Sequence, residues 1–193
     1  MKKDGLTLPD GYRLVREVDI QKNKKLSVWL NVAALVIAAG MAIGALFLRK
    51  SEGSFTVDGT TLLVFLGMFV ATILYLFAHE GVHGIFIYYF CKKRPQFGFT
   101  GFYAYAGQKD AYFSKRHYAV IALAPVVLLG VLLLLLNLLF PAWFWAIYFI
   151  QVMNLSGAVG DLYVTALLSK LPADTLCNDD GVSMRFYSAS LSD

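Results

Sequence analysis

The sequence predicts an all-α, polytopic membrane protein with about four transmembrane helices and a small β-hairpin at the membrane surface. Of the 193 residues, 58% are hydrophobic and only 16% are charged, and the mean hydropathy is +0.61. One water-soluble core of this size could not bury that much apolar surface. The charged residues also lie almost entirely between long apolar runs rather than along one face of a helix.

Four apolar stretches are long enough to cross the hydrocarbon core of a bilayer, which takes about 20 helical residues. They are residues 26–48, 61–90, 118–140 and 142–171. The first is not expected to be a cleavable signal peptide, because a long polar segment precedes it and no small-residue cleavage site follows it. We therefore expect an N-terminal segment at 1–25, a four-span membrane domain at 26–171 and a polar, poorly ordered C-terminal tail at 172–193.

The distribution of Lys and Arg predicts the orientation of the spans, because cytoplasmic loops carry an excess of basic residues. The segment before the first span and the loop after the second span are both rich in Lys and Arg, whereas residues 49–60 balance two basic against two acidic residues. We therefore expect a multi-pass protein of the cell membrane with both termini in the cytoplasm. Cys91 and Cys177 would then face a reducing compartment, where a structural disulfide is not expected.

Residues 95–108 alternate aromatic residues with glycines, a pattern typical of a short hairpin or an edge strand. The alternative interpretation is an aromatic belt at the membrane interface. The basic residues of the chain are not interleaved with stacking aromatics, so we expect no nucleic-acid partner.

Two acidic residues, Glu80 and Asp161, lie inside apolar spans. An ionisable group at that depth costs several kcal/mol unless it is paired, hydrated or bound to a metal. Glu80 belongs to the segment His79-Glu80-Gly81-Val82-His83, a complete H-E-x-x-H motif that uses two of the three histidines in the chain. The motif therefore predicts a site rather than a packing contact.

On a helix, a spacing of four residues places His79 and His83 on one face, so both imidazoles can bind a single Zn²⁺. Glu80 follows the first ligand and can act as the catalytic general base, which takes a proton from water and later delivers it to a leaving amine. The alternative is a pair of histidines that form hydrogen bonds between helices, with Glu80 as their partner.

A catalytic zinc site normally has three protein ligands, and Asp161 is the first candidate for the third. His79 lies 18 residues past Thr61 and Asp161 lies 19 residues past Ala142, so both should lie at one depth near the cytoplasmic side. Glycine and alanine residues just before Asp161 would let the fourth helix approach the second closely. The alternative third ligand is His117, at the cytoplasmic mouth of the third span.

Asn154 lies seven residues before Asp161, on the same helical face and two turns away. Its amide could have a catalytic role, by donating a hydrogen bond to the oxyanion that develops on a scissile carbonyl. It could equally form a helix–helix hydrogen bond.

These motifs resemble a bacterial family of small four-span membrane proteins described as zincin peptidases, and they are similar to the zinc site of site-2 proteases. The resemblance covers roughly residues 77–171 and rests on HEGVHG at 79–84, LAPVVLL at 123–129 and NLSGAVGDLY at 154–163. In site-2 proteases the late motif is Asn-Pro followed by Leu-Asp-Gly, with the Asp as third zinc ligand and the Asn near the substrate carbonyl. Here no proline follows Asn154, and Gly160 precedes Asp161. The resemblance implies proteolysis.

We therefore expect a zinc metalloprotease that cleaves a transmembrane or juxtamembrane peptide substrate near the cytoplasmic face. The hairpin around residues 97–105 could hold an extended substrate by strand addition. The alternative function is a non-catalytic metal-binding membrane protein such as a permease, sensor or assembly factor, which would use the same ligands without needing Glu80. The expected partners are a membrane protein or peptide substrate and the lipid bilayer, and the sequence indicates no particular oligomeric state.

Overall fold

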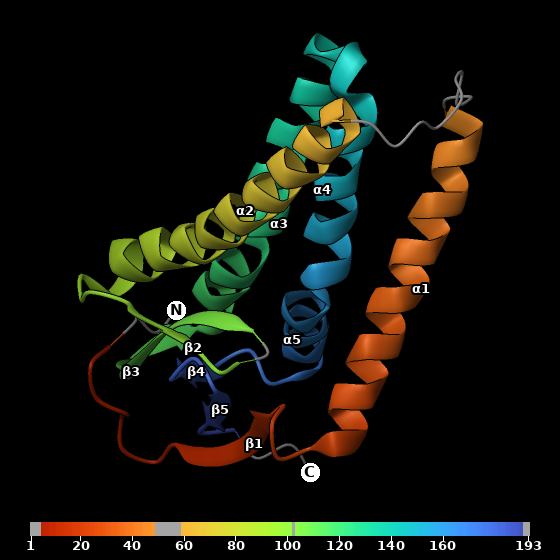
Figure 1. Ribbon diagram of the computed structural model, residues 1–193. Coiled ribbons are helices and arrows are strands. Elements are labelled where there is room, and N and C mark those ends of the chain that lie inside the picture. Colours follow the sequence, from red (N-terminus) through yellow and green to blue (C-terminus); the bar gives the residue numbers. More distant parts are fainter. Residues whose placement is uncertain (1–4, 49–58, 102, 191–193) are drawn as a thin grey trace.

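The computed structural model describes residues 5–48, 59–101 and 103–190. The helices are α1 (Lys24–Leu48), α2 (Gly59–Cys91), α3 (Lys115–Leu139), the 3₁₀ turn η1 (Pro141–Trp143), α4 (Phe144–Gly157) and α5 (Val159–Lys170). The strands are β1 (Arg13–Asp19), β2 (Gln96–Phe99), β3 (Ala104–Ser114), β4 (Leu176–Asp179) and β5 (Ser183–Ser188). Figure 1 shows the long helices rising from one side of a small sheet, which lies at the bottom of the view.

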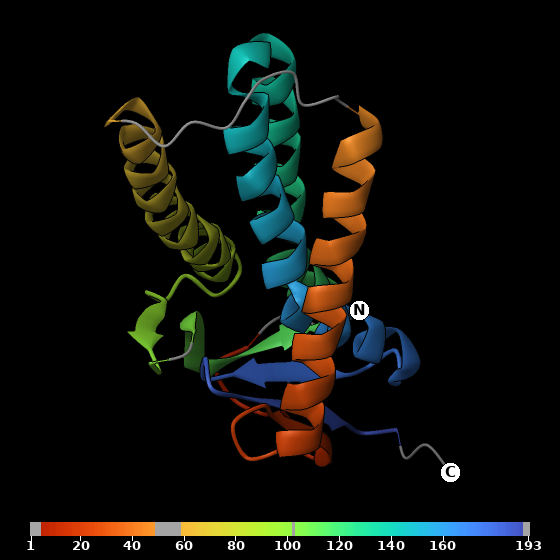
Figure 2. The ribbon, with the colours of Figure 1, turned by 45° about the vertical axis from the view of Figure 1, so that its right-hand side comes forward.

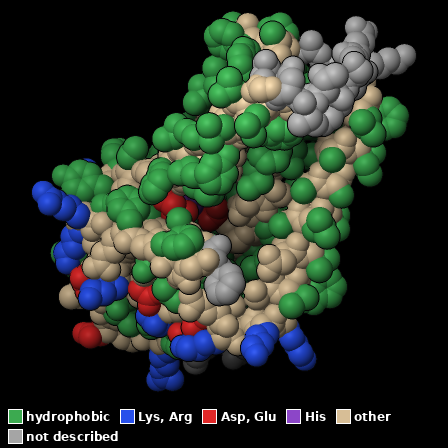
Figure 3. All heavy atoms as spheres, viewed as in Figure 1, with side chains coloured by type: hydrophobic (Ala, Val, Ile, Leu, Met, Phe, Trp, Pro, Cys, Tyr) green, Lys and Arg blue, Asp and Glu red, His purple; other side chains and the backbone are tan. Residues whose placement is uncertain are grey.

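In the part of the chain that the structure describes, four helical segments are long and apolar enough to cross a membrane, as the sequence predicts. They are Lys24–Phe47, Thr61–Cys91, Lys115–Leu139 and Pro141–Lys170. Apolar side chains cover the upper helices in Figure 3, whereas Lys and Arg gather over the sheet end. The fourth segment is not one continuous helix, because α4 ends at Gly157, α5 begins at Val159, and Ala158 lies between them with non-helical dihedral angles.

The hairpin predicted at residues 95–108 is confirmed as β2 and β3, but it belongs to a larger sheet. Among residues 5–48, 59–101 and 103–190, five strands form an antiparallel sheet in the order β1-β5-β4-β3-β2, so β2 lies at one edge. The segment before the first span contributes β1, and the segment after the fourth contributes β4 and β5. The sheet therefore joins three parts of the chain that are far apart in the sequence.

The expectation of a poorly ordered tail is wrong for residues 172–190. Cys177 in β4 is 1% exposed and Phe186 in β5 is 0% exposed, so these strands contribute to the hydrophobic core. The side-chain amide of Asn178 donates to the carbonyls of Lys109 and Ala111, at 2.8 and 2.9 Å. These bonds satisfy two carbonyls of β3 where its pairing with β4 is irregular. A polar side chain of the tail thus stabilises the sheet.

Helix α2 buries one narrow stripe of side chains. Tyr75, His79, His83 and Ile87 are all buried and follow one another at intervals of four residues, which places them along one face of the helix. Ile87 lies in the core, together with Tyr118 and other residues that α3, α5 and the sheet contribute. The sheet and this core thus form a packed base beneath the two histidines of α2.

Helix α1 stands apart from α2. Within the described part of the chain, α1 packs against α4 and α5 and not against α2, and both ribbon views show the separation (Figures 1 and 2). The hydroxyl of Tyr148 in α4 donates to the carbonyl of Met41 in α1 at 2.8 Å. Helix α1 is therefore attached through α4, away from the histidines.

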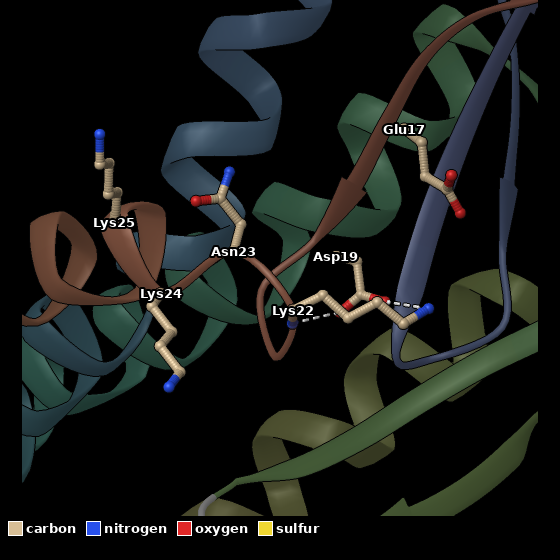
Figure 4. A pocket seen from close by; sticks show the side chains of 6 residues that line it. All are labelled: Glu17, Asp19, Lys22, Asn23, Lys24 and Lys25. Atoms are coloured by element: carbon tan, nitrogen blue, oxygen red, sulfur yellow. Dashed lines mark hydrogen bonds and ion pairs between the residues drawn. The ribbon is translucent and has the colours of Figure 1, made fainter.

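A shallow hollow lies where β1 leads into α1 (Figure 4). It is lined by Glu17, Asp19, Lys22, Asn23, Lys24 and Lys25. The side-chain oxygen of Asn23 accepts from the backbone N–H of Leu26 at 3.0 Å and caps the helix. Lys22 pairs with Asp19 at 3.1 Å, whereas Lys24 and Lys25 extend outward, so basic groups surround the start of the first span.

Burial of the Asp179 carboxyl group in β4 predicts a pH-dependent stability. Burial raises the pKa of Asp179 to about 6, although the hydroxyl of Tyr118 and the backbone N–H of Gly181 donate to its two oxygens. Because the native pKa lies above the ordinary value of 3.8, this group favours the folded state while it is protonated. Its contribution to the free energy of unfolding, on the order of 3 kcal/mol, is therefore lost as the pH rises from about 4 through about 6.

The measurement is thermal unfolding of the detergent-solubilised protein at pH 5 and pH 7.5. We expect Asp179→Asn to lose less stability over this interval than the wild type does, because asparagine does not ionise. Asp110→Asn, the same change at an exposed position of β3, serves as the control. Equal losses in all three proteins would show that Asp179 does not cause the pH dependence.

Candidate metal centre

The H-E-x-x-H motif is helical, as its spacing predicts. His79 and His83 lie one turn apart on α2, and their ring centroids are 5.0 Å apart. His79, Glu80 and His83 each offer one ligand atom, and these atoms lie within 4.8 Å of one another. The two imidazoles are 9% and 8% exposed, so the pair is buried at the level where α2 approaches the sheet.

Asp161 meets both imidazoles. Its Oδ2 lies 3.3 Å from Nε2 of His79, and its Oδ1 lies 3.5 Å from Nε2 of His83. Asp161 occupies the first turn of α5, where the positive end of the helix dipole favours a carboxylate. His79 and Asp161 therefore lie at the same level of the fold, and we call His79, His83 and Asp161 the His–Asp cluster.

A break in the fourth segment, and not close helix packing, brings Asp161 to the histidines. A Cβ atom added at Gly157 or at Gly160 would meet nothing within 4 Å, so a larger side chain at either glycine would not block an approach to α2. The chain instead leaves its helical path at Ala158, and Asp161 follows in the new first turn. The expectation that Gly157 and Gly160 let the fourth segment approach α2 closely is therefore wrong.

Hydrogen bonds at Nδ1 direct Nε2 of both imidazoles toward Asp161. Nδ1 of His83 lies 2.8 Å from the carbonyl of Ile121, and because a carbonyl only accepts, Nδ1 carries the proton. Nδ1 of His79 lies 3.0 Å from the hydroxyl of Tyr75. That hydroxyl donates its proton to Oδ1 of Asn154 at 2.8 Å, so it accepts from His79. Both Nε2 atoms therefore keep a lone pair for a ligand.

Proline explains why the Ile121 carbonyl is available to His83. Pro125 lies inside α3, four residues after Ile121, and a proline has no N–H to donate to that carbonyl. The carbonyl therefore lacks its helical partner and accepts from the imidazole instead. Tyr75 and the Ile121–Pro125 pair were not identified from the sequence, although a tyrosine one turn before His79 and a proline inside an apolar helix were visible signals.

The geometry of the His–Asp cluster fits a zinc ion. Two ligand atoms that each lie about 2.1 Å from a tetrahedral metal are about 3.4 Å apart, close to the observed 3.3 and 3.5 Å between Nε2 and carboxylate atoms. When both imidazoles are neutral, their two lone pairs face a carboxylate with no proton between them to share. A divalent cation satisfies all three groups at once, and nitrogen and carboxylate donors are ligands that zinc accepts.

Glu80 lies next to this cluster and faces the hairpin. Its carboxylate interacts with the backbone N–H of Ala106 in β3. Gly84, one turn further along α2, packs so closely on β2 that an added Cβ would lie 2.5 Å from the ring of Phe97. The edge strand β2 therefore lies beside the H-E-x-x-H motif. Figure 3 shows acidic side chains at the bottom of a hollow between the apolar helices and the sheet.

Asn154 and His117 have other contacts in this structure. Asn154 is fully buried, and its amide nitrogen donates to the carbonyl of Val126 at 3.1 Å while its oxygen accepts from Tyr75. The helix–helix hydrogen bond considered for Asn154 is thus present, and its oxyanion role stays a prediction. The ring of His117 stacks on Phe90, with 4.2 Å between the ring centroids. Phe90 lies about two helical turns past His83 on α2, so His117 is away from His79 and His83, whereas Asp161 contacts both of their imidazoles.

A family model described as "Putative zincin peptidase" matches residues 72–176, a span that covers more than half of the chain. The matched span includes α3 and the five side chains of the predicted site, from His79 to Asp161. The comparison with curated proteins and the comparison with solved structures find no match.

Proposed function

The chain belongs to this family of zincin peptidases, and from that premise we propose that it is a membrane-embedded zinc metalloprotease. Its substrate would be a transmembrane or juxtamembrane segment of another membrane protein, cut near the cytoplasmic face. One observation carries the proposal: the carboxylate of Asp161 meets Nε2 of both H-E-x-x-H histidines at distances typical of neighbouring zinc ligands. A non-catalytic metal-binding role needs the same three side chains. Only the peptidase also needs Glu80, so a substitution of Glu80 distinguishes the two functions.

Each side chain has a distinct role in the proposed reaction. His79, His83 and Asp161 would hold the metal, and a bound Zn²⁺ would supply a Lewis acid for the scissile carbonyl and for the attacking water. Glu80 takes a proton from the attacking water and delivers it to the leaving amine. The apolar helices around the site exclude bulk water, which strengthens the electrostatic interactions inside it.

The position of the cluster along α2 supports cleavage near one membrane surface. His79 lies 20 residues after the start of α2 and 12 residues before its end, or about 30 and 18 Å along the helix axis. The nearer end is the one that carries the sheet. A substrate helix that leaves the bilayer at this end would pass the site at the point where it can unwind. Unwinding exposes the backbone carbonyl that peptide cleavage requires.

The edge strand supports a way to hold such an unfolded segment. Among the described residues, β2 pairs with β3 on one side only, so its outer edge presents backbone donors and acceptors. Phe97 and Phe99 are both exposed on this strand, and Phe97 packs over Gly84 beside the motif. We propose that an extended substrate adds to this edge, which would lead its backbone past Glu80.

The charge distribution supports an orientation with the sheet end in the cytoplasm. Basic residues surround the start of α1 and follow α2 at Lys92, Lys93 and Arg94, and cytoplasmic loops favour such residues. We expect a periplasm-active reporter inserted at Ser54 to be active and a cytoplasm-active reporter fused after Ser190 to be active. A cytoplasmic signal from Ser54 would contradict both this orientation and the proposed side of water entry.

The activity is tested with the purified full chain in reconstituted membranes. We expect about one zinc ion per chain and cleavage of a single-span membrane protein at a bond near its cytoplasmic end, mapped by mass spectrometry of the fragments. A chelator should stop the cleavage, and added Zn²⁺ should restore it. Stoichiometric zinc without cleavage of any of a broad set of single-span proteins would favour the metal-binding alternative.

A further inference from the structure

We propose that Asn154 and Tyr75 are positioning residues that select the metal-binding tautomer of His79. The inference rests on the proposed zinc site and assigns these two residues a role in it. Three hydrogen bonds connect α3, α4 and α2: Asn154 to the Val126 carbonyl, Tyr75 to Asn154, and His79 to Tyr75. Asn154 is 0% exposed and Tyr75 is 8% exposed, so water does not compete for these groups.

The direction of each bond follows from the one before it. The carbonyl of Val126 only accepts, so the amide nitrogen of Asn154 faces it and the amide oxygen faces Tyr75. The single proton of the tyrosine hydroxyl is then given to Asn154. Its oxygen has only acceptor capacity left for Nδ1 of His79. His79 is thereby held with its proton on Nδ1 and its Nε2 lone pair toward Asp161.

Removing Asn154 would reverse the last bond of this chain. In Asn154→Leu the hydroxyl of Tyr75 loses its acceptor, and the lone pair at Nδ1 of a neutral His79 becomes its new acceptor. The ring proton then lies on Nε2, where it donates to Asp161 and occupies the position that a metal needs. In Tyr75→Phe no hydroxyl remains, so His79 loses its orienting partner but gains no competing donor.

His83 and Tyr148 provide internal references. His83 donates directly to a backbone carbonyl, that of Ile121, so its tautomer does not depend on Asn154. Tyr148 also donates to a backbone carbonyl between helices, that of Met41, but it lies on the α1 side of α4. Tyr148→Phe therefore removes a comparable interhelical hydrogen bond without touching the His–Asp cluster.

The first measurement is zinc affinity of the full chain in detergent, by competition with a chelator. We expect Tyr75→Phe and Asn154→Leu each to weaken binding about 10- to 100-fold, as losses of outer-shell partners do. Tyr148→Phe should leave it unchanged. Asn154 acts through Tyr75. Adding Asn154→Leu to the Tyr75→Phe variant should therefore weaken zinc binding by no more than a further factor of about 2. Independent, multiplicative losses would instead show that Asn154 contributes by packing and would overturn the proposal.

The second measurement is the ¹⁵N spectrum of the imidazoles in metal-free protein, at a pH high enough that the imidazoles are neutral; only three histidines contribute. We expect protonated Nδ1 for His79 in the wild type and protonated Nε2 in Asn154→Leu, with His83 unchanged in both. An unchanged His79 spectrum in that variant contradicts the inference whether or not zinc binds. If the wild type binds no zinc while His79 shows the expected tautomers, the proposed function fails and the positioning role of Asn154 and Tyr75 stands.

Discussion

Glu80→Gln is expected to lower cleavage by about 10²- to 10⁴-fold, because a positioned general base contributes that much to a proton transfer. Glutamine keeps the size of the side chain and its place on α2 but cannot take a proton from water. Zinc content should stay at the wild-type value, since Glu80 is not a ligand in the proposed site. The measurements are the initial cleavage rate in reconstituted membranes and the metal content of the same preparations.

A matched control makes the same chemical change away from the site. Glu17 in β1 accepts from Arg185 of β5 at 3.2 Å and is partly exposed, so Glu17→Gln should leave the cleavage rate within a small factor of wild type. If Glu80→Gln lost its zinc as well, Glu80 would be a ligand instead of a base. If it kept full function in cells while His79→Ala abolished that function, the metal-binding alternative would replace the peptidase.

Asp161→Asn is expected to weaken zinc binding by more than about 100-fold, because loss of a ligand exceeds the effect of losing an outer-shell partner. The amide keeps the shape of the side chain, but it carries no charge to balance the metal. The wild type should also release zinc as the pH falls, since the imidazoles bind only when they are neutral. Equilibrium competition with a chelator at several pH values measures both effects.

The alternative third ligand is tested in the same series. His117→Ala should retain zinc at the wild-type affinity, because the His117 ring stacks on Phe90 while Asp161 contacts both motif histidines. Asp110→Asn supplies the same acid-to-amide change on an exposed part of β3. Full retention of zinc in Asp161→Asn together with its loss in His117→Ala would identify His117 as the ligand.

The sequence predicted the parts of this molecule that depend on local spacing. The four apolar segments follow from length and composition, and the pairing of His79 with His83 follows from helical periodicity. The meeting of Asp161 with both imidazoles was expected from counting residues along the second and fourth spans from the same side of the membrane. That these three side chains bind zinc and that Glu80 acts as a base stay predictions.

The features that the sequence did not predict depend on contacts between distant segments. β4 and β5 are short and polar, and they are ordered because Asn178 and Phe186 find partners in β3 and in the core. The hydrogen bond from Tyr75 to Asn154 crosses from α2 to α4, so no local pattern reveals it. The break at Ala158 was hidden because the hydropathy of residues 141–170 remains that of one span.

The pairing of β1 with β5 imposes an order of events during synthesis. Arg13 pairs with Ser188, so β1 emerges from the ribosome long before its partner exists. At about 5 to 20 residues per second, the interval between the two strands is roughly 10 to 35 seconds. During that time β3 also lacks β4, and the base beneath His79 and His83 is incomplete. The base that supports both histidines is therefore completed only after the strands that follow the fourth segment have been synthesised.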